Sequence, residues 1–327
     1  MPPRTSPLSG ILSALGAFAL FATHDVAVKM LGGAYSTFQI VFFSVLLTFP
    51  LVVLMLLRDA EVGTLIPRHP WWSALRTGAA VITAICAFYA FSVLPLAEVY
   101  AILFAAPLFI TVLSIPILGE VVRIHRWGAV VAGLIGVLVV LRPGGTALSL
   151  GHAAALTAAV SGALGSVIVR KIGREERAAV LMLYPMMANV VLMGMILPFV
   201  YRPMPLQDLG LWAAMAGLAF LASLALIKAY RRADAVLVAP MQYSQILWAA
   251  LYGWLFFDER LDGGTAAGAA IIILSGLYIV WREGRGRSRN APVRATRSRA
   301  ETGTAPRISL LLRRTERDAK GDGEGER

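Results

Sequence analysis

Three ionisable side chains lie close together in the first long apolar stretch of the chain, at His24, Asp25 and Lys29 in FATHDVAVKM. An ionisable group in a membrane-spanning helix costs roughly 2.5–3.5 kcal/mol on insertion scales, so it indicates a function. Asp25 and Lys29 are four residues apart and share one helical face, where they could form a salt bridge. Lys29 could instead extend to the membrane surface. We predict for Asp25 either substrate or proton binding or a structural salt bridge, and for His24 either the same site or hydrogen-bonded packing.

A second acidic group, Glu98, opens a later apolar stretch, with Tyr100 two residues on and Tyr89 in the stretch before. Together they could contact a cationic or hydroxylated substrate. A carboxylate also stabilises the N-terminus of a helix, so capping by Glu98 is the alternative.

Polar and aromatic residues follow Pro240 in another apolar stretch, at Gln242, Gln245 and Trp248. Gln245 and Trp248 share one helical face and can point into one cavity. Amides and aromatic rings suit a planar, polar organic ligand, because rings stack and amides bind without the desolvation cost of an ion. Simple packing is the alternative for Trp248.

The sequence predicts no catalytic residues, metal site or cofactor. It has no HExxH, GxSxG or GxxxxGK[ST] motif, and its one cysteine, Cys86, cannot form an intramolecular disulfide or a thiolate cluster. We therefore expect neither an enzyme nor an ATP-driven transporter.

The composition is typical of a membrane protein. Hydrophobic residues make up 58% of the 327 residues and charged residues only 15%, against roughly 45–50% and 25% in soluble domains. The net charge is +11, but thirteen Lys or Arg against seven Asp or Glu, a net of +6, lie from Arg282 onward. That basic tail lacks apolar periodicity, so we expect it to be disordered and to bind anionic lipid headgroups rather than nucleic acid.

Ten apolar stretches of about the length that crosses a bilayer follow one another. They cover residues 8–31, 36–57, 71–93, 97–118, 124–141, 150–170, 178–200, 208–229, 235–257 and 265–281. Most Lys and Arg of the short loops lie on the same side as the basic tail, so the positive-inside rule places both termini in the cytoplasm. The sequence predicts an all-α, multi-pass protein of the cytoplasmic (inner) membrane.

The two halves of this array resemble each other. Glu120 aligns with Glu259, and the helices that follow align in their glycines and valines. Five helices is an odd number, so related halves must be inverted relative to each other in the membrane, as in many secondary transporters. The chain is accordingly divided into residues 1–7, a first repeat at 8–141, a second repeat at 150–282 and the tail at 283–327.

The first helix of each half aligns as well, with Val26 and Val28 on Val167 and Val169. A basic residue therefore closes this helix in both halves, which favours a structural role for Lys29. Gly165 and Ser166 stand where the first half has its His–Asp pair. Any charge chemistry at that position is asymmetric between the repeats.

This pattern resembles the drug/metabolite transporter superfamily, and within it the EamA-type transporters. PLAEVYAILFAAPLFITVLSIPILGE, residues 95–120, carries the resemblance best, with the Gly119–Glu120 pair echoed at Asp258–Glu259. DVAVK and STFQIVFF also resemble the branch of riboflavin and S-adenosylmethionine uptake carriers, although Ser44 stands where that branch has an arginine. The resemblance implies a cavity lined by helices 1 to 4 and 6 to 9.

Several residues are expected to be structural. Pro107 should kink its helix, and Glu120 and Glu259 should cap helices or pair with loops. Small residues, including Gly128, Gly136 and Gly268, let helices approach closely within the bundle or, alternatively, in a homodimer.

The predicted function is secondary transport of a small organic metabolite by alternating access, coupled to H⁺ or Na⁺ or by exchange. Uptake of a riboflavin-like or S-adenosylmethionine-like substrate and efflux of amino acids or drugs are narrower alternatives. A channel or a scaffold is the alternative outside transport.

Overall fold

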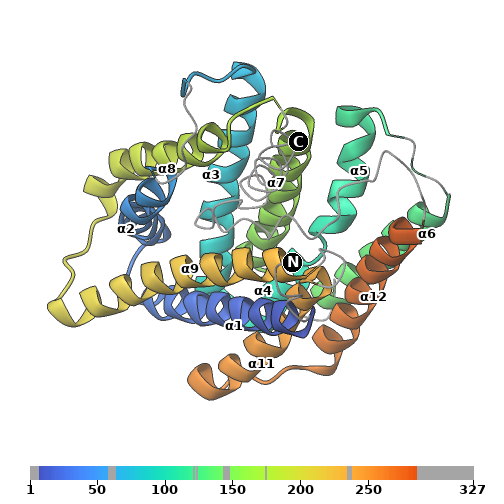
Figure 1. Cartoon of the computed structure of the whole chain (residues 1–327). Helices are drawn as coiled ribbons and strands as arrows, with labels where there is room; N and C mark the ends of the chain where they lie inside the picture. The colour runs from blue at the N-terminus through green and yellow to red at the C-terminus, as the bar shows by residue number, and fades with distance from the viewer. Residues whose placement is uncertain are drawn as a thin grey trace.

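The structure is a computed structural model, and it describes residues 7–57, 64–120, 122, 124–142, 148–173, 175–233 and 238–285. Every regular element within these ranges is a helix (Figure 1). In chain order they are α1 (Pro7–Gly32), α2 (Thr37–Leu57), α3 (Pro70–Val93), α4 (Leu96–Leu103), α5 (Ala106–Leu118), α6 (Ile124–Leu141), α7 (Leu150–Ile172), α8 (Ala178–Val200), α9 (Leu206–Arg232), the 3₁₀ helix η1 (Ala239–Tyr243), α11 (Ser244–Phe257) and α12 (Gly263–Arg285). Most of the predicted basic tail lies outside the described residues.

Within the described ranges, six helical segments are long and apolar enough to cross a bilayer. They are Leu8–Gly32, Pro70–Val93, Leu96–Leu118, Leu150–Ile172, Ala179–Val200 and Asp208–Tyr230. Three further apolar helices are shorter, at Thr37–Val53, Trp127–Leu141 and Gly263–Tyr278. The predicted span at 235–257 contains η1 and α11, and residues 234–237 lie outside the described part. The all-helical class is confirmed, whereas the count of ten spans and their orientation stay predictions.

The predicted fourth span is broken where the sequence places Pro107. Helix α4 ends at Leu103 and α5 begins at Ala106, with the Phe104 N–H bonded to the carbonyls of Tyr100 and Ile102. A proline has no N–H to donate, and its ring disfavours a continuous helix. The position that aligns with this break in the second half is the junction of η1 and α11.

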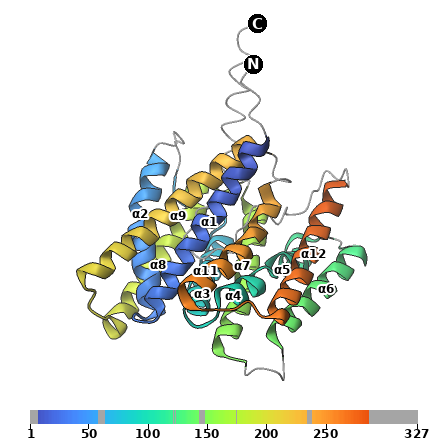
Figure 2. The same cartoon turned by 90° about the horizontal axis from the view of Figure 1, so that it is seen from below.

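The helices pair across the predicted halves in a reciprocal way. Helix α1 packs along α9, and α3 packs along α7, so the first helix of each half contacts the third of the other. Like helices also pair, α2 with α8 and α6 with α12, which Figures 1 and 2 show at opposite sides of the molecule.

Small residues allow a close approach of α6 and α12. A Cβ on Gly136 of α6 would lie 2.9 Å from the Gly268 carbonyl oxygen, and a Cβ on Gly268 would lie 2.7 Å from the Gly136 oxygen. A Cβ on Gly128 would meet nothing within 4 Å. Gly136 and Gly268 therefore pack α6 against α12 within one chain, and the homodimer stays a prediction.

Candidate transport site

Asp25 lies about two turns before the C-terminal end of α1, and it is almost completely buried. One of its carboxylate oxygens is 2.7 Å from Nδ1 of His24, and the other accepts a hydrogen bond from the Tyr100 hydroxyl. The amide of Gln245 donates to the same hydroxyl at 3.3 Å. All four side chains are at most 4% exposed. We call these residues, His24, Asp25, Tyr100 and Gln245, the central network.

The broken helices position two members of this network. Tyr100 lies in the last turn of α4, just before the break, and Gln245 lies in the first turn of α11, just after η1. Aromatic rings hold Tyr100 from two sides, with the Phe91 and Phe104 rings centred 5.3 and 5.9 Å away. The central network therefore joins helices of both predicted halves.

The two nitrogens of the His24 ring have different surroundings. Beside an ionised Asp25 carboxylate, which only accepts hydrogen bonds, Nδ1 would carry the proton and donate it. The other ring nitrogen, Nε2, is buried and has no hydrogen-bond partner among the described residues. The ring is also held edge-on against Phe88, with centroids 6.1 Å apart. His24 therefore offers one unused polar atom beside a buried carboxylate.

The alternative prediction of an Asp25–Lys29 salt bridge is wrong. Lys29 pairs instead with Glu259, at 2.5 Å from Nζ to the carboxylate, and donates a second hydrogen bond to the Leu94 carbonyl. The other oxygen of Glu259 accepts the N–H of Leu96 at 3.0 Å. Lys29 therefore joins the end of α1 to α11 and to the start of α4.

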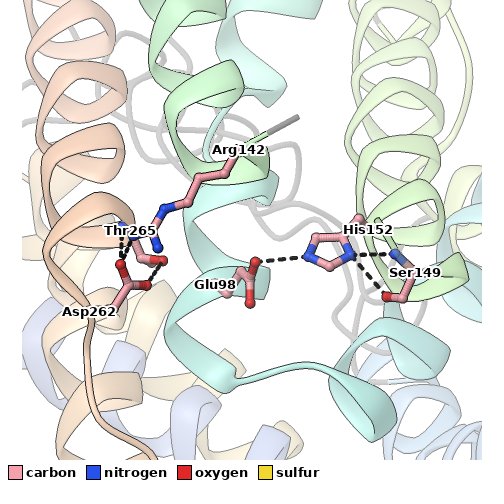
Figure 3. A network of polar contacts seen from close by, with 6 residues as sticks. All are labelled: Glu98, Arg142, Ser149, His152, Asp262 and Thr265. Atoms are coloured by element: carbon pink, nitrogen blue, oxygen red, sulfur yellow. Dashed lines mark hydrogen bonds and ion pairs between the residues drawn. The ribbon is translucent and has the colours of Figure 1, made fainter. Parts of the chain in front are cut away.

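Glu98 has a partner that the sequence does not suggest. Its carboxylate is 2.8 Å from Nε2 of His152 on α7, as Figure 3 shows. Nδ1 of His152 accepts the N–H of Ser149 at 3.0 Å, so the proton of a neutral ring lies on Nε2 and is donated to Glu98. The Ser149-x-x-His152 spacing is a capping box. It is the signal that could have located His152 at a helix start.

The hydrogen bonds of the described residues do not join the other predicted side chains, Trp248, Tyr89 and Gln242, to the central network. Trp248 stacks on Tyr252, with ring centroids 6.1 Å apart, and the Tyr252 hydroxyl accepts a hydrogen bond from Thr23 at 3.3 Å. Among the hydrogen bonds between described residues, none connects the side chain of Tyr89 or Gln242 to Asp25 or its partners. Both of these side chains are only partly buried.

Polar contacts also hold the connections at the predicted outer ends of the helices. Arg142 pairs with Asp262, which accepts hydrogen bonds from the N–H and the hydroxyl of Thr265 at the start of α12 (Figure 3). Tyr35, between α1 and α2, donates to Asp208 of α9. This hydrogen bond, with a smaller contribution from burial, raises the pKa of Tyr35 to about 12.

The fold is a helical bundle with apolar spans, and its interior holds a buried carboxylate bonded to His24 and to Tyr100, whose hydroxyl in turn accepts from Gln245. The chain belongs to the EamA-like transporter family, which it matches over residues 8–142 and 149–281. It is therefore a multi-pass membrane protein of a transporter family, which confirms both the predicted family and the predicted multi-pass localisation.

Three of the relatives are named as transporters. The chain is 26% identical over 269 residues to the pseudopaline exporter CntI of Pseudomonas aeruginosa, covering 82% of this chain and 94% of the relative. It is 25% identical to an S-adenosylmethionine uptake transporter of Rickettsia bellii, covering 82% and 92%. A riboflavin transporter of Vibrio cholerae is 30% identical over 212 residues, which are 64% of this chain and 70% of the relative. A solved crystal structure, 20% identical, shares the fold with a TM-score of 0.54, over 83% of this chain and 96% of that chain.

Proposed function

We propose that the protein is a secondary transporter that carries a small organic metabolite by alternating access, with proton binding at His24 and Asp25 as the coupling step. The observation that carries the proposal is the central network, a buried carboxylate bonded to a histidine, a tyrosine and, through the tyrosine, a glutamine. Helices of both halves supply these side chains. Relative motion of the halves would therefore change the surroundings of the carboxylate.

The charge of the pair explains why a proton would be coupled to transport. With His24 neutral and Asp25 ionised, the pair carries one negative charge at membrane depth, where an uncompensated charge is costly. Histidine is the side chain whose charge ordinarily changes near neutral pH. A proton on the buried Nε2 of His24 would bring the pair to net neutrality, and a bound cationic group could do the same.

The inverted-repeat architecture with ten spans and cytoplasmic termini is part of this proposal. It is supported by the reciprocal pairing of α1 with α9 and α3 with α7. It is also supported by helix junctions at Phe104–Ala105 and Tyr243–Ser244, which are equivalent when the two halves are aligned through Glu120 and Glu259. Secondary transporters commonly place such interrupted helices around a binding site near the midplane.

The substrate class follows from the groups around the carboxylate. The Tyr100 ring and the Gln245 amide provide an aromatic face and hydrogen-bonding groups, and His24 adds an unused nitrogen. These suit a polar organic molecule with hydrogen-bond donors. The names of the three relatives refer to small molecules, and they include both export and uptake.

The test is transport by purified protein in proteoliposomes, with a panel of S-adenosylmethionine, riboflavin, amino acids and quaternary amines. For a transported compound, we expect saturable uptake that an opposing pH gradient alters and that unlabelled compound inside the vesicles accelerates. Asp25→Asn should abolish the response to the pH gradient, while the protein still inserts and stays monodisperse. Dependence on Na⁺ in place of pH would reject the proton, and flux without saturation or exchange would indicate a channel.

A matched control variant exists at Asp208. Its carboxylate also accepts a hydrogen bond from a tyrosine, Tyr35, but it lies at the end of α9 away from the central network. Asp208→Asn should therefore keep the pH response of transport. Equal losses in both variants would show that the effect comes from losing any Tyr–Asp hydrogen bond, including this partly buried one.

A further inference from the structure

We infer that two equivalent salt bridges, one near each end of the bundle, are the alternating gates of this transporter. The first, Lys29–Glu259, is named the outer gate pair, and the second, Arg170–Glu120, is named the inner gate pair. The inference rests on the alternating-access mechanism proposed above. It assigns to four residues a function beyond the structural role that the sequence suggests.

Each residue of one gate pair aligns with a residue of the other gate pair in the opposite half of the chain. When the two halves are aligned, Lys29 corresponds to Arg170, and Glu120 corresponds to Glu259. In each pair the basic residue ends the first helix of one half, and the acid follows the fourth helix of the other half. Both salt bridges therefore cross between the halves. A two-fold relation would convert one into the other.

The same local geometry presents both acids. Gly119 and Asp258, the residues just before them, cap α5 and α11 in the left-handed conformation, with φ of 69° and 54°. The N–H of each glutamate then bonds back to the helix, to Ser114 at 3.5 Å and to Gly253 at 3.0 Å. These two acceptors also occupy equivalent positions in the aligned halves. Such a cap turns the chain sharply, so it returns each carboxylate toward the bundle.

The outer gate pair lies next to the central network. Lys29 follows Asp25 by four residues, about 6 Å along α1. The pair also holds the backbone on either side of Pro95, through the Leu94 carbonyl and the Leu96 N–H. Leu96 is one helical turn before Tyr100, so release of Glu259 would free the half-helix that carries the tyrosine. Opening this gate would thereby be coupled to the site.

The inner gate pair lies at the opposite end of the predicted bundle. Arg170 contacts both carboxylate oxygens of Glu120, the longer contact being 3.2 Å, and Lys171 beside it donates to the Ile117 carbonyl at 2.8 Å. The side chains of both gate pairs are between 12% and 21% exposed. They are thus buried enough to hold the helices and close enough to the surface to be hydrated when they separate. The structure has both pairs formed, as in an occluded state.

Hydrogen–deuterium exchange on the purified full chain, without substrate, tests the gates. Glu259→Gln should speed amide exchange at the outer segments 96–100 and 258–262 by at least about tenfold, the population change from losing a charge-assisted hydrogen bond. Exchange at the inner segments 117–120 and 170–173 should stay unchanged or slow down. Glu120→Gln should give the opposite pattern. Changes in the same segments in both variants, or in neither, would refute the gates.

Charge exchange and a matched control complete the design. Lys29→Glu with Glu259→Lys restores the opposite charges, so it should recover protection at 258–262 but not at 96–100, because a lysine side chain cannot accept the Leu96 N–H. It also gives a readout if single variants do not fold. Arg142→Gln removes another salt bridge between the halves, Arg142–Asp262, but from the fifth helices α6 and α12. Because Asp262 lies inside 258–262, this control is read at 96–100 and at the inner segments, where exchange should stay unchanged. A control that opens segment 96–100 equally, or a swap that restores folding but not protection at 258–262, would overturn the inference.

This experiment separates the gates from the proposed coupling site. Asp25→Asn keeps both gate pairs, so its exchange pattern should retain protected outer and inner segments. If transport proves independent of pH while the two gate variants still act on opposite segments, the coupling proposal fails and the gates stand. If the pH response holds but the exchange patterns do not oppose each other, the gates fail alone.

Discussion

The hydroxyl of Tyr100 links Asp25 of the first half of the chain to Gln245 of the second half. Its removal therefore tests the central network directly. The hydroxyl donates to Asp25 and accepts from Gln245. A hydrogen bond to a charged group contributes about 1.5–3 kcal/mol, and a buried donor left without an acceptor costs about 1–3 kcal/mol. Because these effects overlap, we expect Tyr100→Phe to lower the free energy of unfolding by about 2–4 kcal/mol.

The measurement is equilibrium unfolding in mixed detergent micelles, followed by tryptophan fluorescence, in a double-mutant cycle with Asp25→Asn. Residues in direct contact show coupling energies of about 0.5–3 kcal/mol, whereas independent sites add within about 0.3–0.5 kcal/mol. The double variant should thus be more stable than the sum of the single losses predicts, by about 1–3 kcal/mol.

Tyr89→Phe is the matched control, because Tyr89 is a partly buried tyrosine of the neighbouring helix α3 that does not bond to Asp25. It should change the unfolding free energy by less than about 0.5 kcal/mol. Additive losses in the cycle, or equal losses for Tyr89→Phe and Tyr100→Phe, would refute the central network as the structure draws it.

Two further predictions concern packing and pH. Gly268→Leu should destabilise the contact of α6 with α12 and lower the melting temperature, because the new side chain would meet the Gly136 carbonyl oxygen. Gly128→Leu should not lower it, because a side chain there would point into open space. Equal shifts of the melting temperature in the two variants would contradict this. The raised pKa of Tyr35, about 12, means that its hydrogen bond to Asp208 contributes stability fully below pH 10 and loses it as the pH rises towards 12. The melting temperature of the wild type should therefore fall more steeply between pH 9 and 11.5 than that of Tyr35→Phe. Parallel plots of melting temperature against pH would reject a stabilising Tyr35–Asp208 hydrogen bond.

Several features of the fold are readable in the sequence because they depend on composition and order along the chain. Apolar stretches, loop charges and the position of Pro107 predict helices, membrane class and the break before α5. The repeat signal at Glu120 and Glu259 also survives in the sequence, because the same turn follows the same helix in both halves. These are local properties, so no tertiary information is needed to find them.

The partners of the polar residues are not readable in the same way. The spacing of Asp25 and Lys29 is compatible with a salt bridge, yet Lys29 bonds to Glu259, which lies in the other half of the chain. Glu98 likewise bonds to His152 across 54 residues. Spacing fixes which side chains share a helical face, but the rotation of each helix and its neighbours decide which of several acceptors a side chain reaches.

The sequence by itself determined that the chain is a helical membrane protein of the EamA type, with a duplicated plan and a buried acid in its first helix. It could do so because each of these properties follows from residue types in order. Only the tertiary structure decided that Asp25 bonds to His24 and Tyr100. It also decided that Lys29 and Arg170 each form a salt bridge with a glutamate of the other half. Those pairings arise when α1, α4, α5, α7 and α11 pack together, and contacts between distant segments leave no pattern in a single sequence.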